Sequence, residues 1–243
     1  MRTLAVYSSK GGVGKTSLAV NLAWAAATLS RRRTLLWDLD AQAGASFILA
    51  PNAKRREEAR TVIEREVMPD RLIVKTGIEG LDLLPADASL RTLDLLFVDI
   101  GANKRLQRIG ENLAKDYDRI VVDCPPGLGV TAEQVIRSAA LILLPIIPSG
   151  LATRAADELR AYLDARKKAP PIISVFNLVD RRRASHREAL AQFPDRPAIP
   201  MASAVEQMAD RHAPIGSYAP RSPAATAVVD LWRDIEERIN RAD

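Results

Sequence analysis

The chain reads Lys-Gly-Gly-Val-Gly-Lys-Thr-Ser at residues 10–17, directly after the apolar run Leu4–Tyr7 and before an alanine- and leucine-rich segment. This order predicts a strand, a glycine-rich turn and a helix. Such a turn presents backbone N–H groups and the positive end of the helix dipole to a polyphosphate. The glycines let the backbone approach the phosphates because they have no Cβ atom. The stretch therefore predicts a nucleotide-binding loop.

Two side chains of this loop have the chemistry that a triphosphate requires. Lys15 can reach the β- and γ-phosphates, and the Thr16 hydroxyl can ligate Mg²⁺. The usual pattern G-x-x-x-x-G-K-[ST] has a glycine where this chain has Ser9, and a second lysine, Lys10, stands just inside the loop. We expect the loop to contact the nucleotide through Lys10, Gly11, Gly12, Val13, Gly14, Lys15, Thr16 and Ser17.

Apolar runs alternate with helical patterns along the chain, which predicts an α/β fold with a mainly parallel twisted sheet and helices on both faces. No linker is long enough to divide the chain, so we expect residues 1–243 to form a single domain. The expected strands are residues 2–8, 33–38, 80–85, 118–123, 140–146 and 171–177. The expected helices are residues 15–30, 55–67, 103–115, 130–138, 151–167, 184–192, 203–210 and 223–241.

The composition narrows the class of protein. Hydrophobic residues make up 47% of the 243 residues, which is ample for a core, and Lys plus Arg exceed Asp plus Glu by 35 to 30. No apolar run approaches the roughly 20 residues that a membrane-spanning helix needs. The N-terminus enters a strand directly, and Cys124 is the one cysteine of the sequence. We therefore expect a cytoplasmic protein without a signal peptide or an internal disulfide.

The segment Lys10–Thr16 resembles the deviant Walker A motif of the ParA/MinD family of dimerising P-loop ATPases. The similarity extends along nearly the whole chain. Trp37–Gln42 resembles the D-x-D-P-Q segment of the family, and Val121–Gly127 resembles its Walker B strand and second switch. Leu144–Pro148 and Tyr218–Ser222 resemble the next strand and the C-terminal end. Within the family, the ParA branch fits best.

The resemblance implies that ATP and Mg²⁺ are the cofactors. Thr16 and Asp123 would hold Mg²⁺, and Asp40 would orient and polarise the attacking water. Asp38 would support Lys15 or the metal shell, although an ordinary loop or cap carboxylate is the alternative for either aspartate. The chain departs from the family after these residues, because Ala41 replaces a proline and Ala43-Gly44 replace Gly-Asn.

Two further roles follow from the resemblance. Lys10 would reach the nucleotide of a partner subunit, so that ATP holds a homodimer together; a solvated lysine at the loop mouth is the alternative. The expected catalytic set is therefore Lys10, Lys15, Asp38 and Asp40. Asn177, expected to end the strand Ile172–Phe176, would pair with the adenine edge or simply cap the strand.

A second stretch imitates a Walker B strand. Leu95–Asp99 also has four apolar residues before an aspartate. We prefer Asp123 because the rigid turn Pro125–Gly127 follows it and can place a backbone N–H near a γ-phosphate. Asp99 is expected at the end of a strand or helix.

The sequence also indicates which surface, a membrane or DNA, an ATP-bound dimer would bind. A MinD-like membrane helix would be basic, but the last helix carries Asp234, Glu236 and Glu237. A ParA-like protein needs a basic surface for non-specific DNA binding, and three clusters offer one: Arg31–Arg33, Lys54–Arg56 and the set Arg181, Arg182, Arg183 and Arg187. The last set is our expected DNA-binding site, with a solvated helix start as the alternative.

The favoured function is therefore an ATP-dependent DNA partition ATPase, nucleoid-associated and released from DNA when a ParB-like partner stimulates hydrolysis. Ala204 stands where ParA proteins often carry a DNA-contacting arginine, and Arg211 or Arg221 could replace it. Two alternatives stay open: a ParA-like ATPase that positions a chemoreceptor array or microcompartment, and a nucleotide-gated regulator with negligible hydrolysis. One cysteine excludes a cluster that needs two per subunit, and His186 and His212 lack metal-ligand spacing.

Overall fold

The computed structural model describes residues 3–53, 58–65, 71–101, 104–164 and 169–241. In these residues an eight-stranded sheet has the order β3-β4-β2-β5-β1-β6-β7-β8. All neighbouring strands are parallel except β3 and β4. The strands are β1 (Thr3–Val6), β2 (Thr34–Asp38), β3 (Val74–Lys75), β4 (Leu81–Leu84), β5 (Arg119–Asp123), β6 (Leu141–Ile146), β7 (Ile172–Val179) and β8 (Ala198–Pro200).

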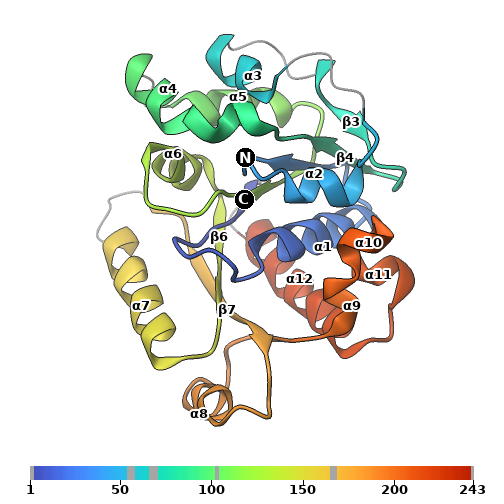
Figure 1. Cartoon of the computed structure of the whole chain (residues 1–243), viewed down its shortest axis with the longest axis vertical. Helices are drawn as coiled ribbons and strands as arrows, with labels where there is room; N and C mark the ends of the chain where they lie inside the picture. The colour runs from blue at the N-terminus through green and yellow to red at the C-terminus, as the bar shows by residue number, and fades with distance from the viewer. Residues whose placement is uncertain (1–2, 54–57, 66–70, 102–103, 165–168, 242–243) are drawn as a thin grey trace.

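Helices cover both faces of this sheet (Figure 1). One face packs against α1 (Lys15–Thr28), α2 (Gly44–Leu49), α10 (Met208–Arg211), α11 (Ile215–Tyr218) and α12 (Pro223–Arg241). The other packs against α3 (Ala59–Arg65), α4 (Leu93–Asp99), α5 (Arg105–Leu113), α6 (Val130–Ser138), α7 (Gly150–Asp164) and α8 (Ala184–Gln192). The 3₁₀ helix η2 (Ala88–Thr92) precedes α4, and the short helix α9 (Ser203–Glu206) precedes α10.

The strands are buried on both faces, which is why they read as nearly continuous apolar runs in the sequence. Alternate residues of each strand enter opposite halves of the core. On β1, for example, Leu4 and Val6 belong to the half under α1 and α12, whereas Ala5 and Tyr7 belong to the half under α4–α7. The predicted α/β class, the mainly parallel sheet and the helices on both faces are confirmed.

All six expected strands are present, and the short strands β3 and β8 were not predicted. Two or three residues are too few for a period-2 pattern to appear in a sequence. The helices α2, α4 and α11 were also missed, and the expected helix 203–210 is two short helices, α9 and α10. Part of the expected helix 55–67 lies outside the described residues.

Two segments show why local pattern succeeds or fails. The stretch Leu95–Asp99 lies in helix α4, with Leu96 and Phe97 buried and Leu95 exposed, so Asp99 sits at a helix end and not after a central strand. In α12 the expected apolar stripe is buried as a unit, and its Trp232 indole N–H donates to Ser30 Oγ at 2.8 Å. A long periodic helix is therefore recognisable from sequence, and a two-turn helix is not.

Candidate nucleotide-binding site

The glycine-rich loop joins the carboxyl end of β1 to α1, as expected. Gly12 and Gly14 have φ angles of +71° and +83°, a region in which side chains with a Cβ are strained. Gly14 is the N-cap residue of α1, and a Cβ there would lie 2.3 Å from Asn177 Nδ2. No atom lies within 4 Å of the Cβ position of Gly11 or Gly12, so this side of the loop has room for a ligand.

The two lysines of the loop have opposite environments. Lys15 is 6% exposed, and its ammonium donates to the Lys10 carbonyl at 3.1 Å. Its position is therefore set by the loop itself. The Lys10 side chain is exposed and, within the described part of the chain, forms no ion pair. Lys10 is thus the lysine that is available to a group outside its own chain.

A cavity of about 630 Å³ opens in front of the loop. This volume lies in the range of ordinary ligand pockets, about 300–1,000 Å³. Its walls come from the loop, from the segment after β2, from the turn after β5 and from the segment that leads into α9 and α10. The lining includes Gly11, Gly12, Gly14, Lys15, Thr16, Ser17, Asp40, Gln42, Pro126, Leu178, Met201, Val205 and Glu206.

Asp38 ends β2 and is fully buried. Its carboxylate accepts hydrogen bonds from the Asp40 backbone N–H at 3.1 Å, the Ser46 N–H at 2.9 Å and the Ser46 hydroxyl at 2.7 Å. Burial raises the pKa of Asp38 to about 6 in spite of these bonds. In this structure Asp38 fixes the first turn of α2, and its support of Lys15 or the metal shell stays a prediction.

Asp123 lies directly beside Asp38, since β2 and β5 pair in that register. It is fully buried, and neither carboxylate oxygen accepts a hydrogen bond of ordinary geometry from the described residues. Burial, and next the charge of Asp38, raises the pKa of Asp123 well above its usual value, although the nearby Thr16 hydroxyl favours the charged form. Buried polar groups nearly always have a partner. An unpartnered carboxylate beside a threonine hydroxyl is a set of oxygens that fits Mg²⁺.

Asp40 is half-exposed and borders the cavity. Its Oδ1 accepts the Gln42 N–H at 2.9 Å, which leaves Oδ2 available to a water or ligand.

The residues after Asp40 depart from the sequence pattern of the family. Ala43 has a φ of +54°, so an alanine occupies a left-handed position where the family has glycine. The first switch nevertheless leads into a helix, since α2 begins at Gly44. A Cβ atom at Gly44 would lie only 3.1 Å from Thr16 Cγ2, so a glycine fits this position.

The turn after β5 is tied to the phosphate loop. The Gly127 N–H donates to the Ser9 carbonyl at 3.2 Å, and the Tyr7 hydroxyl donates to the Gly127 carbonyl at 2.9 Å. The turn then enters α6, whose Thr131 N–H and hydroxyl donate to Asp94 at 2.8 and 2.6 Å. Sequence reasoning missed Tyr7, Ser46 and Asp94, because each acts on a segment distant in the sequence.

Asn177 lies within β7, which continues to Val179, and does not end the strand as expected. Its side chain is 3% exposed, and its Nδ2 donates to the Val13 carbonyl at 2.8 Å. Asn177 therefore braces the phosphate loop. Contact between its amide and an adenine base stays a prediction.

The three basic clusters differ in how much charge they leave free. Arg32 pairs with Glu236 at 3.0 Å, and Arg33 pairs with Asp118 at 3.3 Å, so the cluster Arg31–Arg33 is largely neutralised. The cluster Lys54–Arg56 lies outside the described residues.

The third cluster lies at the start of α8, as expected, with Arg187 inside the helix, and all four of its arginines are exposed. Arg182 forms a two-pronged pair with Asp180 at 2.9 and 3.0 Å, which lowers the pKa of Asp180 to about 2. Arg187 donates to the carbonyls of Arg181 and Arg182 at 3.0 and 2.8 Å. Arg181 and Arg183 make no ion pair within the described residues.

The histidines and the cysteine have structural places. The Asp180 N–H donates to Nδ1 of the buried His186 at 3.0 Å, and His212 packs edge-on against Phe47. Cys124 is buried and unpaired. The described residues hold no group of three or more His, Cys, Asp or Glu side chains suited to a metal, and none of their helices is long and apolar enough to cross a bilayer.

The comparisons with known proteins agree with this geometry. Residues 1–172 match the family AAA_31, described as an AAA domain. The chromosome partitioning protein ParA of Caulobacter vibrioides is 28% identical, over 98% of this chain and 95% of its own length.

Two solved structures align over nearly the full length of both chains. Cobyrinic acid a,c-diamide synthase from Mycobacterium smegmatis, bound to an ATP analogue and magnesium, is 28% identical with a TM-score of 0.80, over 98% of this chain and 95% of that one. The cell division ATPase MinD of Pyrococcus furiosus is 25% identical with a TM-score of 0.81, over 98% of this chain and 99% of that one.

Proposed function

The chain belongs to the AAA_31 family and is a P-loop ATPase of the ParA/MinD type, and from this premise we propose that it is a DNA partition ATPase. In the proposed cycle an ATP–Mg²⁺ homodimer binds DNA without sequence preference. A ParB-like partner then stimulates hydrolysis and releases the dimer. We further propose that residues 1–243 act as a single domain. The observation that carries the proposal is that one loop holds both a buried Lys15, whose ammonium the loop positions, and an exposed Lys10 that forms no ion pair with the described residues.

The residues of the cavity divide the work of hydrolysis. Lys15 and the backbone N–H groups of the loop bind the β- and γ-phosphates. Thr16 and Asp123 would hold Mg²⁺, which would supply positive charge against the phosphate oxygens. Asp40 orients the attacking water through its unengaged oxygen. Asp38 acts indirectly, because its hydrogen bonds hold Asp40 and α2 in place.

Dimerisation is proposed to depend on Lys10. Its ammonium stands at the loop mouth and forms no ion pair with an acid of the described residues, so a phosphate of a partner subunit's nucleotide is a suitable acceptor. The dimer would then exist only with bound ATP, and its dissociation after hydrolysis would end DNA binding.

We place the DNA-binding face at Arg181, Arg183 and their neighbours Arg182 and Arg187. Figure 1 shows α8 projecting from the body of the molecule, where a duplex can approach without contact with the sheet. Phosphate contacts carry no base information, so binding is expected to be non-specific and salt-sensitive. Arg211 is a weaker alternative, because its guanidinium lies over the Tyr218 ring at 4.9 Å and donates to Gln207.

The last helix argues against a membrane as the track. Its apolar stripe is buried under the sheet, and its exposed side is occupied by ion pairs such as Asp234–Arg238 at 2.8 Å and Asp230–Arg233 at 3.0 Å. A surface of paired charges offers neither free apolar area nor net positive charge to an anionic bilayer.

DNA retardation in gels tests the proposal. Wild-type protein with ATP and Mg²⁺ should retard two unrelated duplexes equally at low salt, and ADP should abolish the effect. The double variant Arg181→Glu/Arg183→Glu should weaken binding to both duplexes and lower the salt slope by about 2, since about one unit is lost per phosphate contact. The control Arg137→Glu/Arg154→Glu changes the net charge equally but lies on α6 and α7, and it should bind as wild type.

Other results would redirect the proposal. If ATP-bound dimers form but no DNA is retarded, the track is not DNA and a protein cargo, such as a chemoreceptor array or microcompartment, replaces it. If DNA binding occurs but DNA and partner never accelerate ATP turnover, the chain is a nucleotide-gated regulator.

A further inference from the structure

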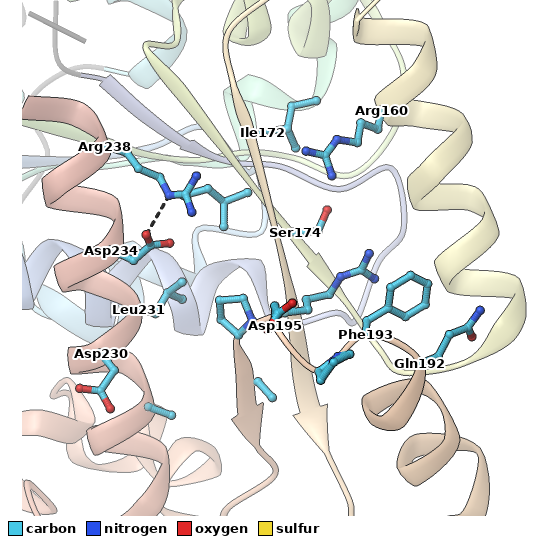
Figure 2. A pocket seen from close by; sticks show the side chains of 16 residues that line it. Arg160, Ile172, Ser174, Gln192, Phe193, Asp195, Asp230, Leu231, Asp234 and Arg238 are labelled. Carbon is cyan, nitrogen blue, oxygen red and sulfur yellow. Dashed lines mark hydrogen bonds and ion pairs between the residues drawn. The ribbon is translucent and has the colours of Figure 1, made fainter. Parts of the chain in front are cut away.

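A second large cavity lies away from the phosphate loop, at the opposite end of the sheet. It is a groove of about 770 Å³ at the sheet edge where β7 begins. Figure 2 shows Arg160 reaching from α7 toward Ile172 on one side of the groove, while the Asp234–Arg238 pair of α12 forms the other side. Because α7 and α12 cover opposite faces of the sheet, the floor of the groove is the sheet edge itself.

The edge is open because β8 is much shorter than β7. β8 pairs only with the second half of β7, from Phe176 to Val179. The Phe176 N–H donates to the Pro197 carbonyl at 2.8 Å, so Phe176 directs its backbone groups toward β8. Backbone direction alternates along a strand, and Ser174 therefore directs its N–H and C=O to the same side. Pro197 has no N–H to donate to the Ser174 carbonyl.

Arg160 and Arg196 both line the groove, and Arg196 forms no ion pair within the part of the chain that the structure describes. Arg196 lies between two aromatic rings, with its guanidinium carbon 4.7 Å from the centre of Phe176 and 4.3 Å from that of Phe193. Its Nη1 is buried without an acceptor. Burial lowers the pKa of Arg196; the charge of Asp157 opposes this shift, and the charge of Arg160 adds to it, so both side chains lie near Arg196.

Asp157 is an acidic residue whose charge acts on Arg196, yet the buried Nη1 of Arg196 has no acceptor. Asp234 is committed to Arg238 at 2.8 Å, and Asp230 to Arg233 at 3.0 Å. Asp195 is exposed and forms no ion pair within the described part of the chain. An anion bound beside the two arginines would satisfy the buried N–H of Arg196.

We propose that this groove binds an extended, acidic peptide segment of a partner protein, which adds alongside β7 and places a carboxylate between Arg160 and Arg196. The open backbone groups at Ser174 supply strand-to-strand hydrogen bonds, which is how sheet edges commonly capture peptides. The arginines supply the preference for acidic side chains. The proposal is independent of the nucleotide chemistry and of the DNA track.

Fluorescence anisotropy with a labelled probe peptide, acetyl-Val-Asp-Val-Glu-Val-Asp-Val-amide, tests the charge component. The probe should bind wild-type protein. A version of the probe with Asn and Gln in place of Asp and Glu should bind about tenfold more weakly, since hydrogen bonds to charged groups are the stronger ones. Arg160→Glu and Arg196→Gln should each lower the affinity for the acidic probe to a similar degree. Arg154→Glu, on the same helix but outside the groove, should leave its affinity unchanged.

A second variant pair tests the strand addition. Ser174→Pro removes the edge N–H but leaves the pairing with β6 intact, because that N–H points away from β6. Ser174→Pro should lower the affinity for the probe, whereas Ser174→Ala should leave it unchanged. Retained ATP binding in each variant shows that the fold is preserved. No probe binding at millimolar concentration, or equal binding of the acidic and neutral probes, would overturn the proposal. Binding that free glutarate displaces and Ser174→Pro does not affect would assign the groove to a small anion and also overturn it.

Discussion

Replacing Asp123 by asparagine should make the nucleotide-free protein more stable and its nucleotide-bound form less so. Asp123 and Asp38 are neighbouring buried carboxylates in paired strands, and Asp123 has no hydrogen-bond partner among the described residues. Such a pair costs folding free energy whenever both are ionised. A cation between Asp123 and Thr16 would offset that cost, and asparagine cannot replace the charge.

The pKa of Asp38 gives the scale, because burial is the largest cause of the raised pKa of both Asp38 and Asp123. Its rise from 3.8 to about 6 corresponds to about 3 kcal/mol at neutral pH, since each pKa unit is 1.36 kcal/mol. The sign follows from linkage: a carboxyl group whose folded pKa is raised stabilises the fold below its unfolded pKa, and that stability is lost as the pH rises through the folded pKa. The pKa of Asp123 is raised as well, so wild-type apoprotein should lose stability from about pH 4 to above pH 6.

For Asp123→Asn we expect a gain of about 1–3 kcal/mol at pH 8 in the apoprotein, or about 2–10 °C in Tm. Thermal and urea unfolding from pH 4 to pH 8, with and without ATP–Mg²⁺, measure both effects. Saturating ATP–Mg²⁺ should stabilise wild type by about 3 kcal/mol at a hundred times Kd, and the variant by much less. Asp99→Asn, at the exposed end of α4, is the matched control and should change neither. A less stable apo variant, or full Mg²⁺-dependent stabilisation in it, would refute this reasoning.

Lys15→Ala should abolish ATP binding in calorimetry, because its ammonium is preset at the loop, and unchanged affinity would contradict the phosphate role. Asp40→Ala should retain ATP but slow turnover about 10²-fold or more and accumulate dimers on size exclusion; wild-type turnover would exclude it as the water-orienting group. Lys10→Ala should bind ATP as a monomer, and normal ATP-dependent dimers in light scattering would disprove the contact between subunits. Ala43→Gly should raise Tm, since a left-handed alanine costs about 1–2 kcal/mol, whereas Ala45→Gly in α2 should lower it, and a loss in both would show that Ala43 is unstrained.

The sequence alone predicted the features that are contiguous in the chain. The loop at residues 10–17 needs only its own glycines and the adjoining strand and helix, so its pattern and its geometry coincide. The alternation of buried strands and helices predicted the parallel sheet, because parallel strands are covered on both faces. The preference for Asp123 over Asp99 also holds in the fold, since Asp123 ends a central strand and Asp99 ends a surface helix.

Only the tertiary structure decided which distant residues meet. Strand order places β2 beside β5, and this alone brings Asp38 against Asp123. Asn177 reaches Val13 across 164 residues because β7 runs beside β6 and toward the same edge as β1. The open edge of β7 depends on the length of β8, which no local pattern encodes. Periodicity in a sequence reports which face of an element is buried, whereas strand order and register decide what that face touches.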